Sequence, residues 1–219
     1  KGIKNKNLIK VKGKPLLTYS LILAKKIKMI NKIFVSTDDK KISNLAKKYG
    51  ANIITRPKKL ASDKSNELES WKHAVKFLNK KKDRFDIFLS LPCTAPLRNK
   101  VDILNSLKKF SNSNVDMVVN ITDTNKNPYF NMVKINRKNE LNIINKNSQN
   151  FFRRQDVPKV FNLTTVAYAA SPKYILNTKN LFDGKIIGNY VPIERSIDID
   201  NKFDLKLAKY LIEKKWKKK

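Results

Sequence analysis

The stretch Lys32–Thr55, KIFVSTDDKKISNLAKKYGANIIT, decides the fold class of this chain. It begins with Lys32–Ser36 (KIFVS), an apolar run typical of a buried strand, and ends with a second such run, Asn52–Thr55 (NIIT). Between them, Lys40–Lys48 repeats its apolar side chains at helical spacing. A strand, a short helix and a second strand in this order form the repeating unit of α/β domains.

The same alternation runs through most of the remaining sequence. Further strands are expected at Asp86–Leu91, Met117–Ile121, Val166–Ala170 and Lys185–Pro192, and further helices at Glu67–Leu78, Val101–Phe110 and Asn201–Lys214. This order predicts a Rossmann-like three-layer sandwich with a mostly parallel sheet and right-handed crossovers. Ligands of such a sheet bind beyond the carboxyl ends of its strands, where the loops STDD, TRPKKLASD and PCTAPLR lie. We expect residues 1–219 to form one domain.

The alternation breaks between Thr122 and Val160. Two possible strands, Phe130–Ile135 and Glu140–Ile144, are joined here by the turn-forming residues NRKN. We therefore predict an inserted β-hairpin over approximately residues 123–160. Projecting hairpins with apolar faces often dimerise, so a homodimer is expected, with a plain surface excursion as the alternative.

The cysteine content and the lengths of the apolar runs indicate the cellular compartment of the protein and whether it has a membrane partner. The single cysteine, Cys93, excludes an internal disulfide and fits a reducing cytosol. Because no run is long enough to span a membrane and no signal peptide is visible, we predict a cytoplasmic protein with no membrane partner.

The formal net charge of +30 raises the alternative of a non-catalytic basic module that binds nucleic acid. Against it, the basic residues are spread from end to end, and only seven of the 48 are arginine. Arginine forks recognise phosphates and base edges in a way that lysine cannot imitate. Abundant lysine, asparagine and isoleucine instead indicate an AT-rich genome, and we expect no specific nucleic-acid partner.

The opening residues, KGIKNKNL, are suited to a polyphosphate. Gly2 allows close backbone approach to an anion, while Lys1, Lys4 and Lys6 neutralise it and lead into Asn7. A solvated lysine-rich terminus is the alternative. A phosphate loop normally follows a buried strand, and none precedes this one. The pattern therefore predicts a nucleotide-handling enzyme whose first strand is missing from the sequence.

Near the other end, RSIDID offers two carboxylates. Asp198 and Asp200 alternate with isoleucines, so extended chain places both carboxylates on one face. Such a pair repels itself unless a cation neutralises it, and hard divalent ions prefer oxygen ligands. The alternative is a helix N-cap, which Asp200 could provide. We favour a metal site, because Asp198 has no helix to cap. Such a metal could lie over the same phosphates as the opening lysines, so we expect Lys6 and Asp198 to converge at one site.

The scarce arginines are the remaining candidates. Arg56 follows a strand where a nucleotide would lie, although an ion pair with Asp63 would explain it equally. One of Arg153 and Arg154, in FFRRQDVP, could bind a substrate carboxylate as a bidentate pair. Arg98 is interpreted as structural. His73 in mid-helix and the thiol of Cys93 are not favoured as catalytic groups.

Six motifs together resemble a known family. KGIKNKNL, VSTDD, TRP…LASD, TAPLR, RRQDVPKVF and RSIDID fall in the order and approximate spacing of the cytidylyltransferases that activate nonulosonic acids. These are the CMP-N-acetylneuraminate synthetases and their legionaminate and pseudaminate relatives, and the resemblance covers essentially the whole chain. It implies a GT-A-like nucleotidyltransferase domain. The family's opening strand and a loop resembling IPARGGSKGI would precede Asn5, so the start of the phosphate loop is expected to be missing.

The resemblance also implies roles for individual residues. In these terms Lys1 and Lys6 contact the phosphates of CTP, Asn7 and Arg56 hold the nucleotide, Asp198 and Asp200 coordinate Mg²⁺, and Arg154 faces the sugar carboxylate. The implied catalytic residues are Lys6, Asp198 and Asp200. The implied reaction transfers CMP from CTP to the anomeric hydroxyl of a nonulosonic acid and releases pyrophosphate, for surface glycans such as lipopolysaccharide or capsule.

Two departures from the family lie on the sugar side. Pro92 replaces a glutamine that often precedes the PTSPLR-type turn, and the segment resembling RPNGAIY reads NLTTVAY, with Asn162, Thr164 and Thr165 where an arginine, asparagine and glycine are common. The nucleotide assignment is therefore firmer than that of the acceptor. A relative acting on another keto sugar, such as 3-deoxy-octulosonate, remains the alternative within enzymes.

Overall fold

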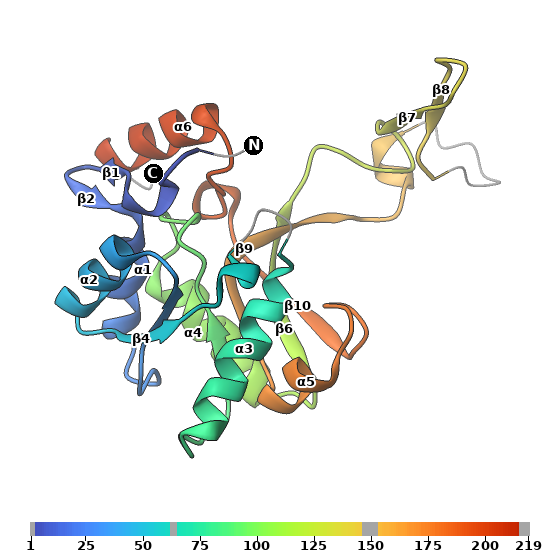
Figure 1. The fold of residues 1–219 in the computed structure, drawn as a ribbon. Coiled ribbons are helices and arrows are strands. Elements are labelled where there is room, and N and C mark those ends of the chain that lie inside the picture. The colour runs from blue at the N-terminus through green and yellow to red at the C-terminus, as the bar shows by residue number, and fades with distance from the viewer. Residues whose placement is uncertain (1–2, 62–64, 146–152, 215–219) are drawn as a thin grey trace.

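The computed structural model describes residues 3–61, 65–145 and 153–214 (Figure 1). Its α-helices are α1 (Leu16–Lys25), α2 (Lys40–Lys48), α3 (Glu67–Lys80), α4 (Lys100–Ser111), α5 (Pro172–Asn177) and α6 (Lys202–Glu213). Its strands are β1 (Lys10–Val11), β2 (Lys14–Pro15), β3 (Phe34–Thr37), β4 (Asn52–Thr55), β5 (Phe88–Ser90), β6 (Met117–Asp123), β7 (Val133–Ile135), β8 (Leu141–Ile143), β9 (Phe161–Ala170) and β10 (Ile186–Tyr190). Four 3-10 turns complete the described chain: η1 (Lys6–Leu8), η2 (Lys58–Leu60), η3 (Arg154–Asp156) and η4 (Ile193–Arg195).

The central sheet has four strands in the order β10-β6-β9-β5. β10 runs parallel to β6, whereas β9 is antiparallel to both of its neighbours. A second parallel pair, β3 and β4, is formed by the segment Lys32–Thr55. In the part of the chain that the structure describes, no ladder joins this pair to the central sheet. The α/β class is thus confirmed. The central sheet is mixed and not mostly parallel as expected, because β9 runs antiparallel to both β6 and β5.

Helices cover both faces of the central sheet, in line with the period of two along its strands. Met117 and Val119 of β6 pack with α3 and α5 on one face. Val118 points to the other face and packs against Ile103 and Leu107 of α4. This gives the expected three layers. In the described part of the chain, no helix has the length and apolar character needed to cross a membrane.

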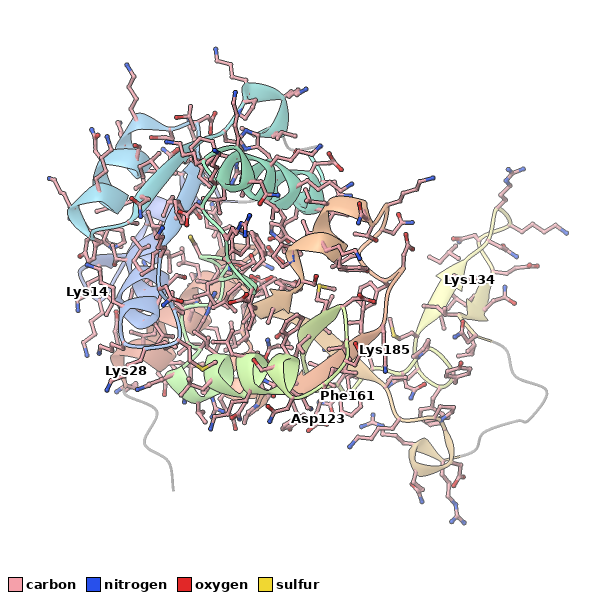
Figure 2. The ribbon with its side chains drawn as sticks, turned by 90° about the horizontal axis from the view of Figure 1, so that it is seen from below. Lys14, Lys28, Asp123, Lys134, Phe161 and Lys185 are labelled. Atoms are coloured by element: carbon pink, nitrogen blue, oxygen red, sulfur yellow. The ribbon has the colours of Figure 1, made fainter. Side chains whose placement is uncertain are left out.

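An arm leaves the domain between β6 and β9 and carries the expected hairpin, β7 and β8 (Figure 1). Asp123 and Phe161, the paired outer ends of β6 and β9, lie at its base, and Lys134 lies out on the hairpin (Figure 2). The hairpin exposes apolar side chains in water. Ile135 and Leu141, which face each other across its ladder, are 64% and 65% exposed.

The basic side chains of the described residues do not gather at one place on the surface. Nitrogen-tipped side chains point outward around the whole outline of the molecule in Figure 2. This spread matches the even distribution along the sequence and is unlike the stripe or groove with which a nucleic-acid module tracks a phosphate backbone.

Candidate active site

The two ends of the described chain meet at one edge of the domain. The Lys6 ammonium, at the start of η1, donates to the carbonyl of Ile199 at 2.6 Å and lies 3.4 Å from the Asp200 carboxylate. Asn5, directly before η1, takes the left-handed conformation that asparagine tolerates (φ 54°) and so turns the chain into this position. The structure thus brings Lys6 and the RSIDID motif together. Lys1 and Gly2 lie outside the described residues.

The two carboxylates of RSIDID lie in different environments. Asp200 is exposed, while Asp198 is partly buried and one of its oxygens, Oδ1, is buried without a hydrogen-bond partner. The buried Ile199 between them fixes the chain, because its N–H donates to the carbonyl of Thr94 at 2.9 Å. The N-cap of α6 is Asn201. The alternative role of Asp200 as that N-cap is therefore wrong.

These residues fit a magnesium ion. A buried carboxylate oxygen without a partner carries a desolvation penalty that a hard cation would remove. Among the described residues, no group of three or more histidine, cysteine, aspartate or glutamate side chains could hold a metal. Mg²⁺ typically binds proteins through one or two carboxylates and takes its other ligands from water and substrate phosphates. Asp198 and Asp200 would hold the ion in this way.

Arg56 is held at the carboxyl end of β3. Its guanidinium donates through Nη2 to the carbonyl of Ser36 at 2.7 Å and through Nε to the Ser36 hydroxyl at 3.2 Å. Its position beyond the strand end is the one expected for a nucleotide contact. Asp63, the alternative partner of Arg56, lies outside the described residues.

The first turn of α3 brings a further carboxylate to the site. Glu67 is exposed, yet protein surrounds it closely enough for desolvation to raise its pKa, and the negative charge of Asp198 raises it further. The indole of Trp71 donates to Glu67, and the nearby Arg56 guanidinium also lowers the pKa. Glu67 therefore interacts electrostatically with both Asp198 and Arg56.

Tyr168 of β9 lies near the Glu67 carboxylate. It is buried against Trp71, with ring centroids 5.1 Å apart. Desolvation, followed by the negative charges of Glu67 and Asp198, raises the pKa of its phenol to about 12, so the phenol stays neutral at physiological pH.

A buried cation, the guanidinium of Arg98, lies close to Asp198. Arg98, in the TAPLR turn, donates through Nε to the carbonyl of Ala95 at 2.8 Å and through Nη2 to that of Pro92. Desolvation lowers the pKa of Arg98 to about 10, so the side chain remains charged at neutral pH. Its Nη1 is buried without a partner. These bonds confirm the structural role expected for Arg98, and its charge also acts on Asp198.

The thiol of Cys93 lies near the cationic side chains of this site. Desolvation raises its pKa, although the cations Arg98, Lys6 and Arg56 oppose the rise in that order. The side chain is therefore a neutral thiol at physiological pH, which agrees with its exclusion as a nucleophile.

A groove of about 630 Å³ opens beside Asp198. Asn162 and Thr164 line it from β9, and Leu207 and Leu211 line it from α6. The charged residues that line it are acidic: Glu194, Asp198 and Asp204. The groove therefore combines apolar and hydroxyl contacts, and among the described residues that line it there is no cation to hold a carboxylate.

Arg154 is not brought to this groove within one chain. It is exposed in η3, which lies on the arm beside the hairpin and away from the domain (Figure 1). Asn7 lies in η1, next to Lys6, and is half-buried. His73 points one ring nitrogen, Nδ1, into the interior without a partner.

Sequence reasoning missed Glu67 as a site residue. The signal that was available is its place at the start of a helix that follows the loop after NIIT, on the ligand-binding edge of the sheet. Its proximity to Asp198 had no such signal, because the two residues are far apart along the chain.

Comparison with known proteins defines the class. Two solved structures share the fold: a CMP:2-keto-3-deoxy-manno-octonic acid synthetase complexed with CTP (TM-score 0.70, 14% identity, 98% of this chain and 94% of that chain) and a 4-diphosphocytidyl-2C-methyl-D-erythritol synthase from Anaerococcus prevotii (TM-score 0.68, 16% identity, 94% and 93%). At these identities the likeness concerns the fold alone.

Sequence comparison goes further. The profile of the cytidylyltransferase family matches residues 1–190, and the chain belongs to that family. It is 31% identical to the post-translational flagellin modification protein B of Campylobacter coli and 31% identical to the CMP-N,N'-diacetyllegionaminic acid synthase of Campylobacter jejuni. Each alignment covers 98% of this chain and 91% of the relative. The chain is thus an enzyme of the nucleotidyltransferase class, and the alternative of a non-catalytic module is wrong.

Proposed function

We propose that this enzyme transfers CMP from CTP to the anomeric hydroxyl of a nonulosonic acid. The observation that carries the proposal is the contact of Lys6 with Ile199 and Asp200, which joins a cationic loop to a carboxylate pair at one edge of the sheet. In the reaction, the anomeric hydroxyl releases its proton to solvent, and its oxygen forms a bond to the α-phosphorus of CTP. The bond from that phosphorus to the β-phosphate bridge breaks, and pyrophosphate leaves.

The first requirement is neutralisation of the triphosphate. Lys6 offers an ammonium held beside Ile199 and Asp200, and Arg56 offers a guanidinium fixed by Ser36. Mg²⁺ held by Asp198 and Asp200 would supply further neutralisation of the charge on the phosphates. Asn7, one residue from Lys6, would orient the nucleotide. Preorganised charge of this kind acts mainly by stabilising the transition state.

The second requirement is a place for the acceptor. The groove beside Asp198 suits a polyhydroxylated sugar, because hydroxyl and amide groups of β9 line it together with leucines of α6. A nonulosonic acid also carries a carboxylate, and the described lining of the groove offers it only acidic charges. We infer that the cation comes from another part of the molecule.

We propose that Arg154 supplies this cation to a second copy of the chain in a homodimer. Within its own chain Arg154 lies on the arm, away from the groove (Figure 1). The exposed pair Ile135 and Leu141 gives the same arm an apolar surface that a second copy would cover. Each arm would then carry an arginine fork to the carboxylate bound by its partner.

The acceptor class rests on the sequence relatives. The relative from Campylobacter jejuni is named as a synthase of a CMP-nonulosonic acid, and the chain is similar to it over nearly its whole length. The likeness to the octonic acid synthetase is one of fold, at 14% identity. We therefore favour a nonulosonic acid over 3-deoxy-octulosonate.

A matrix of substrates tests this proposal. The enzyme with Mg²⁺ would be given each of the four ribonucleoside triphosphates with N-acetylneuraminate, a legionaminic acid, a pseudaminic acid or 3-deoxy-octulosonate, and pyrophosphate release would be measured. We expect turnover with CTP and at least one nonulosonic acid. Turnover with 3-deoxy-octulosonate alone, or with another nucleotide alone, would overturn the assignment.

A further inference from the structure

A buried ion pair lies immediately before the RSIDID carboxylates. Arg195 donates through Nη2 to Oδ1 of Asp102 at 2.8 Å and through Nε to Oδ2 at 2.9 Å, which is the bidentate geometry of a strong pair. Asp102 is 2% exposed, and the side chain of Arg195 is 23% exposed. The two residues come from the first turn of α4 and from the end of η4.

The Asp102 side of this pair is firmly anchored. The same carboxylate accepts the backbone N–H of Asn99 at 2.9 Å and so forms half of the capping box of α4. Behind it, the side-chain amide of Asn189 in β10 donates to the backbone carbonyl of Asp102 at 3.3 Å, to the Ser106 hydroxyl at 3.2 Å and to the side-chain oxygen Oδ1 of Asn120 at 2.8 Å. This network fastens the first turn of α4 to two strands of the central sheet.

Arg195, the other member of the pair, lies close to Asp198 along the chain. Only Ser196 and Ile197 separate them, and the Ser196 hydroxyl donates to the carbonyl of Ile193 at 2.9 Å, which closes the turn. Beyond Asp198, the N–H of Ile199 is held by Thr94 at 2.9 Å. The chain that carries Asp198 is therefore fixed on both sides, by Arg195 before it and by Ile199 after it.

We propose that the Asp102–Arg195 pair is a positioning device that aims the Asp198 carboxylate at the metal–nucleotide complex. Neither residue lines the groove beside Asp198, so both would act through the backbone of the RSIDID segment. Outer partners that orient a metal-binding carboxylate typically change metal affinity by about 10- to 100-fold when they are removed. The inference rests on the proposed role of Asp198 as a metal ligand.

Mn²⁺ replaces Mg²⁺ in the test, because the free aqueous ion has an EPR signal that disappears on binding. Titrations of the full chain in the presence of CTP would compare wild type, Asp102→Asn, Arg195→Gln and Asp198→Asn. We expect Asp102→Asn and Arg195→Gln each to weaken Mn²⁺ binding by about 10- to 100-fold. The double variant should lose no more than the single ones, because both act on one pair.

Control variants separate positioning from general stability. Asp83→Asn removes a comparable ion pair, Lys32–Asp83 at 2.7 Å, which is partly exposed and belongs to other elements. It should leave Mn²⁺ affinity unchanged. Arg195→Lys keeps the positive charge but loses the two-pronged geometry, and should show an intermediate loss. It also keeps the test open if Asp102→Asn fails to fold.

The outcomes are distinct. Wild-type Mn²⁺ affinity in both Arg195→Gln and Arg195→Lys, with binding lost in Asp198→Asn, would overturn this inference and leave the proposed function intact. Wild-type affinity in Asp198→Asn would overturn the metal site itself. A loss in Asp83→Asn equal to that in Arg195→Gln would assign the pair to stability alone.

Discussion

Asp198 and Asp200 occupy similar places in the sequence and different places in the structure. Asp198 has a buried oxygen without a partner, whereas Asp200 is exposed and already faces the Lys6 ammonium. A carboxylate of the first kind gains more from a cation than one of the second. The unequal burial was not predictable from the alternating pattern, which placed both side chains on one face.

This difference predicts unequal effects of the two asparagine substitutions. Asp198→Asn should lower kcat by at least about 100-fold, because it removes charge stabilisation within a partly buried site. Asp200→Asn should have a smaller effect. Pyrophosphate release measures both, and circular dichroism checks that each variant is folded. Equal losses in the two variants would contradict the distinction.

A second prediction concerns the thiol of Cys93. Because desolvation raises its pKa, little thiolate is present at neutral pH, and iodoacetamide should react more slowly than with free cysteine. The rate should rise only at alkaline pH, and CTP should slow it, since the thiol lies near Lys6 and Arg56. Chain mass measured over time at several pH values follows this single cysteine. Rapid labelling at neutral pH would contradict the assignment.

At the scale of elements, the sequence was most informative where the hydrophobic period agrees with the residues that begin and end each element. The unit β3–α2–β4 was predicted nearly to the residue, because apolar runs enclose a helical pattern. The direction of β9 was not, since an apolar run carries no information about which neighbour it pairs with. The N-cap of α6 had an available signal: Asp204 lies three residues after Asn201, the spacing of a capping box.

The capping box of α6 can be tested by removing its first residue. The Asn201 side chain accepts the backbone N–H groups of Phe203 and Asp204 at 2.8 and 3.1 Å. Asn201→Ala should therefore lower the free energy of unfolding by about 1 kcal/mol. Urea denaturation measures the change. Asn112→Ala, at an exposed asparagine that ends α4, is the matched control and should change stability less.

At the scale of the whole molecule, the meeting of the two chain ends was predicted. The buried ion pair that lies next to this meeting point was not. Lysines at one end and carboxylates at the other share a chemistry that points to one ligand, so residue types alone indicated that Lys6 and Asp198 converge. The pair of Asp102 and Arg195 has no such signal. Ion pairs between distant residues depend on tertiary packing, which brings α4 beside the end of β10.

The arm provides the prediction at this scale. Ile135→Glu combined with Leu141→Glu should convert a dimer of 25.4 kDa chains into monomers, because charges replace apolar contacts at the proposed interface. Light scattering after size-exclusion chromatography measures the mass. Phe203→Glu, at an equally apolar side chain that is 73% exposed on α6, is the control and should leave the dimer intact.

Mixing inactive variants would extend the same test. If Arg154 serves the partner's groove, Arg154→Ala and Asp198→Asn chains should regain activity when they are unfolded together and refolded as mixed dimers. In such a dimer one site has an intact Asp198 and receives Arg154 from the other chain. Activity that stays at the level of the separate variants would contradict delivery of Arg154 across the interface.

The central claim is that one site joins CTP to the anomeric oxygen of a nonulosonic acid. Phosphorus NMR of the reaction with CTP, Mg²⁺ and the acceptor selected from the matrix tests it most directly. We expect the three resonances of CTP to be replaced by one phosphodiester resonance and that of pyrophosphate, with no such change for Asp198→Asn. Formation of CMP or CDP without a phosphodiester would show hydrolysis in place of transfer and would contradict the claim.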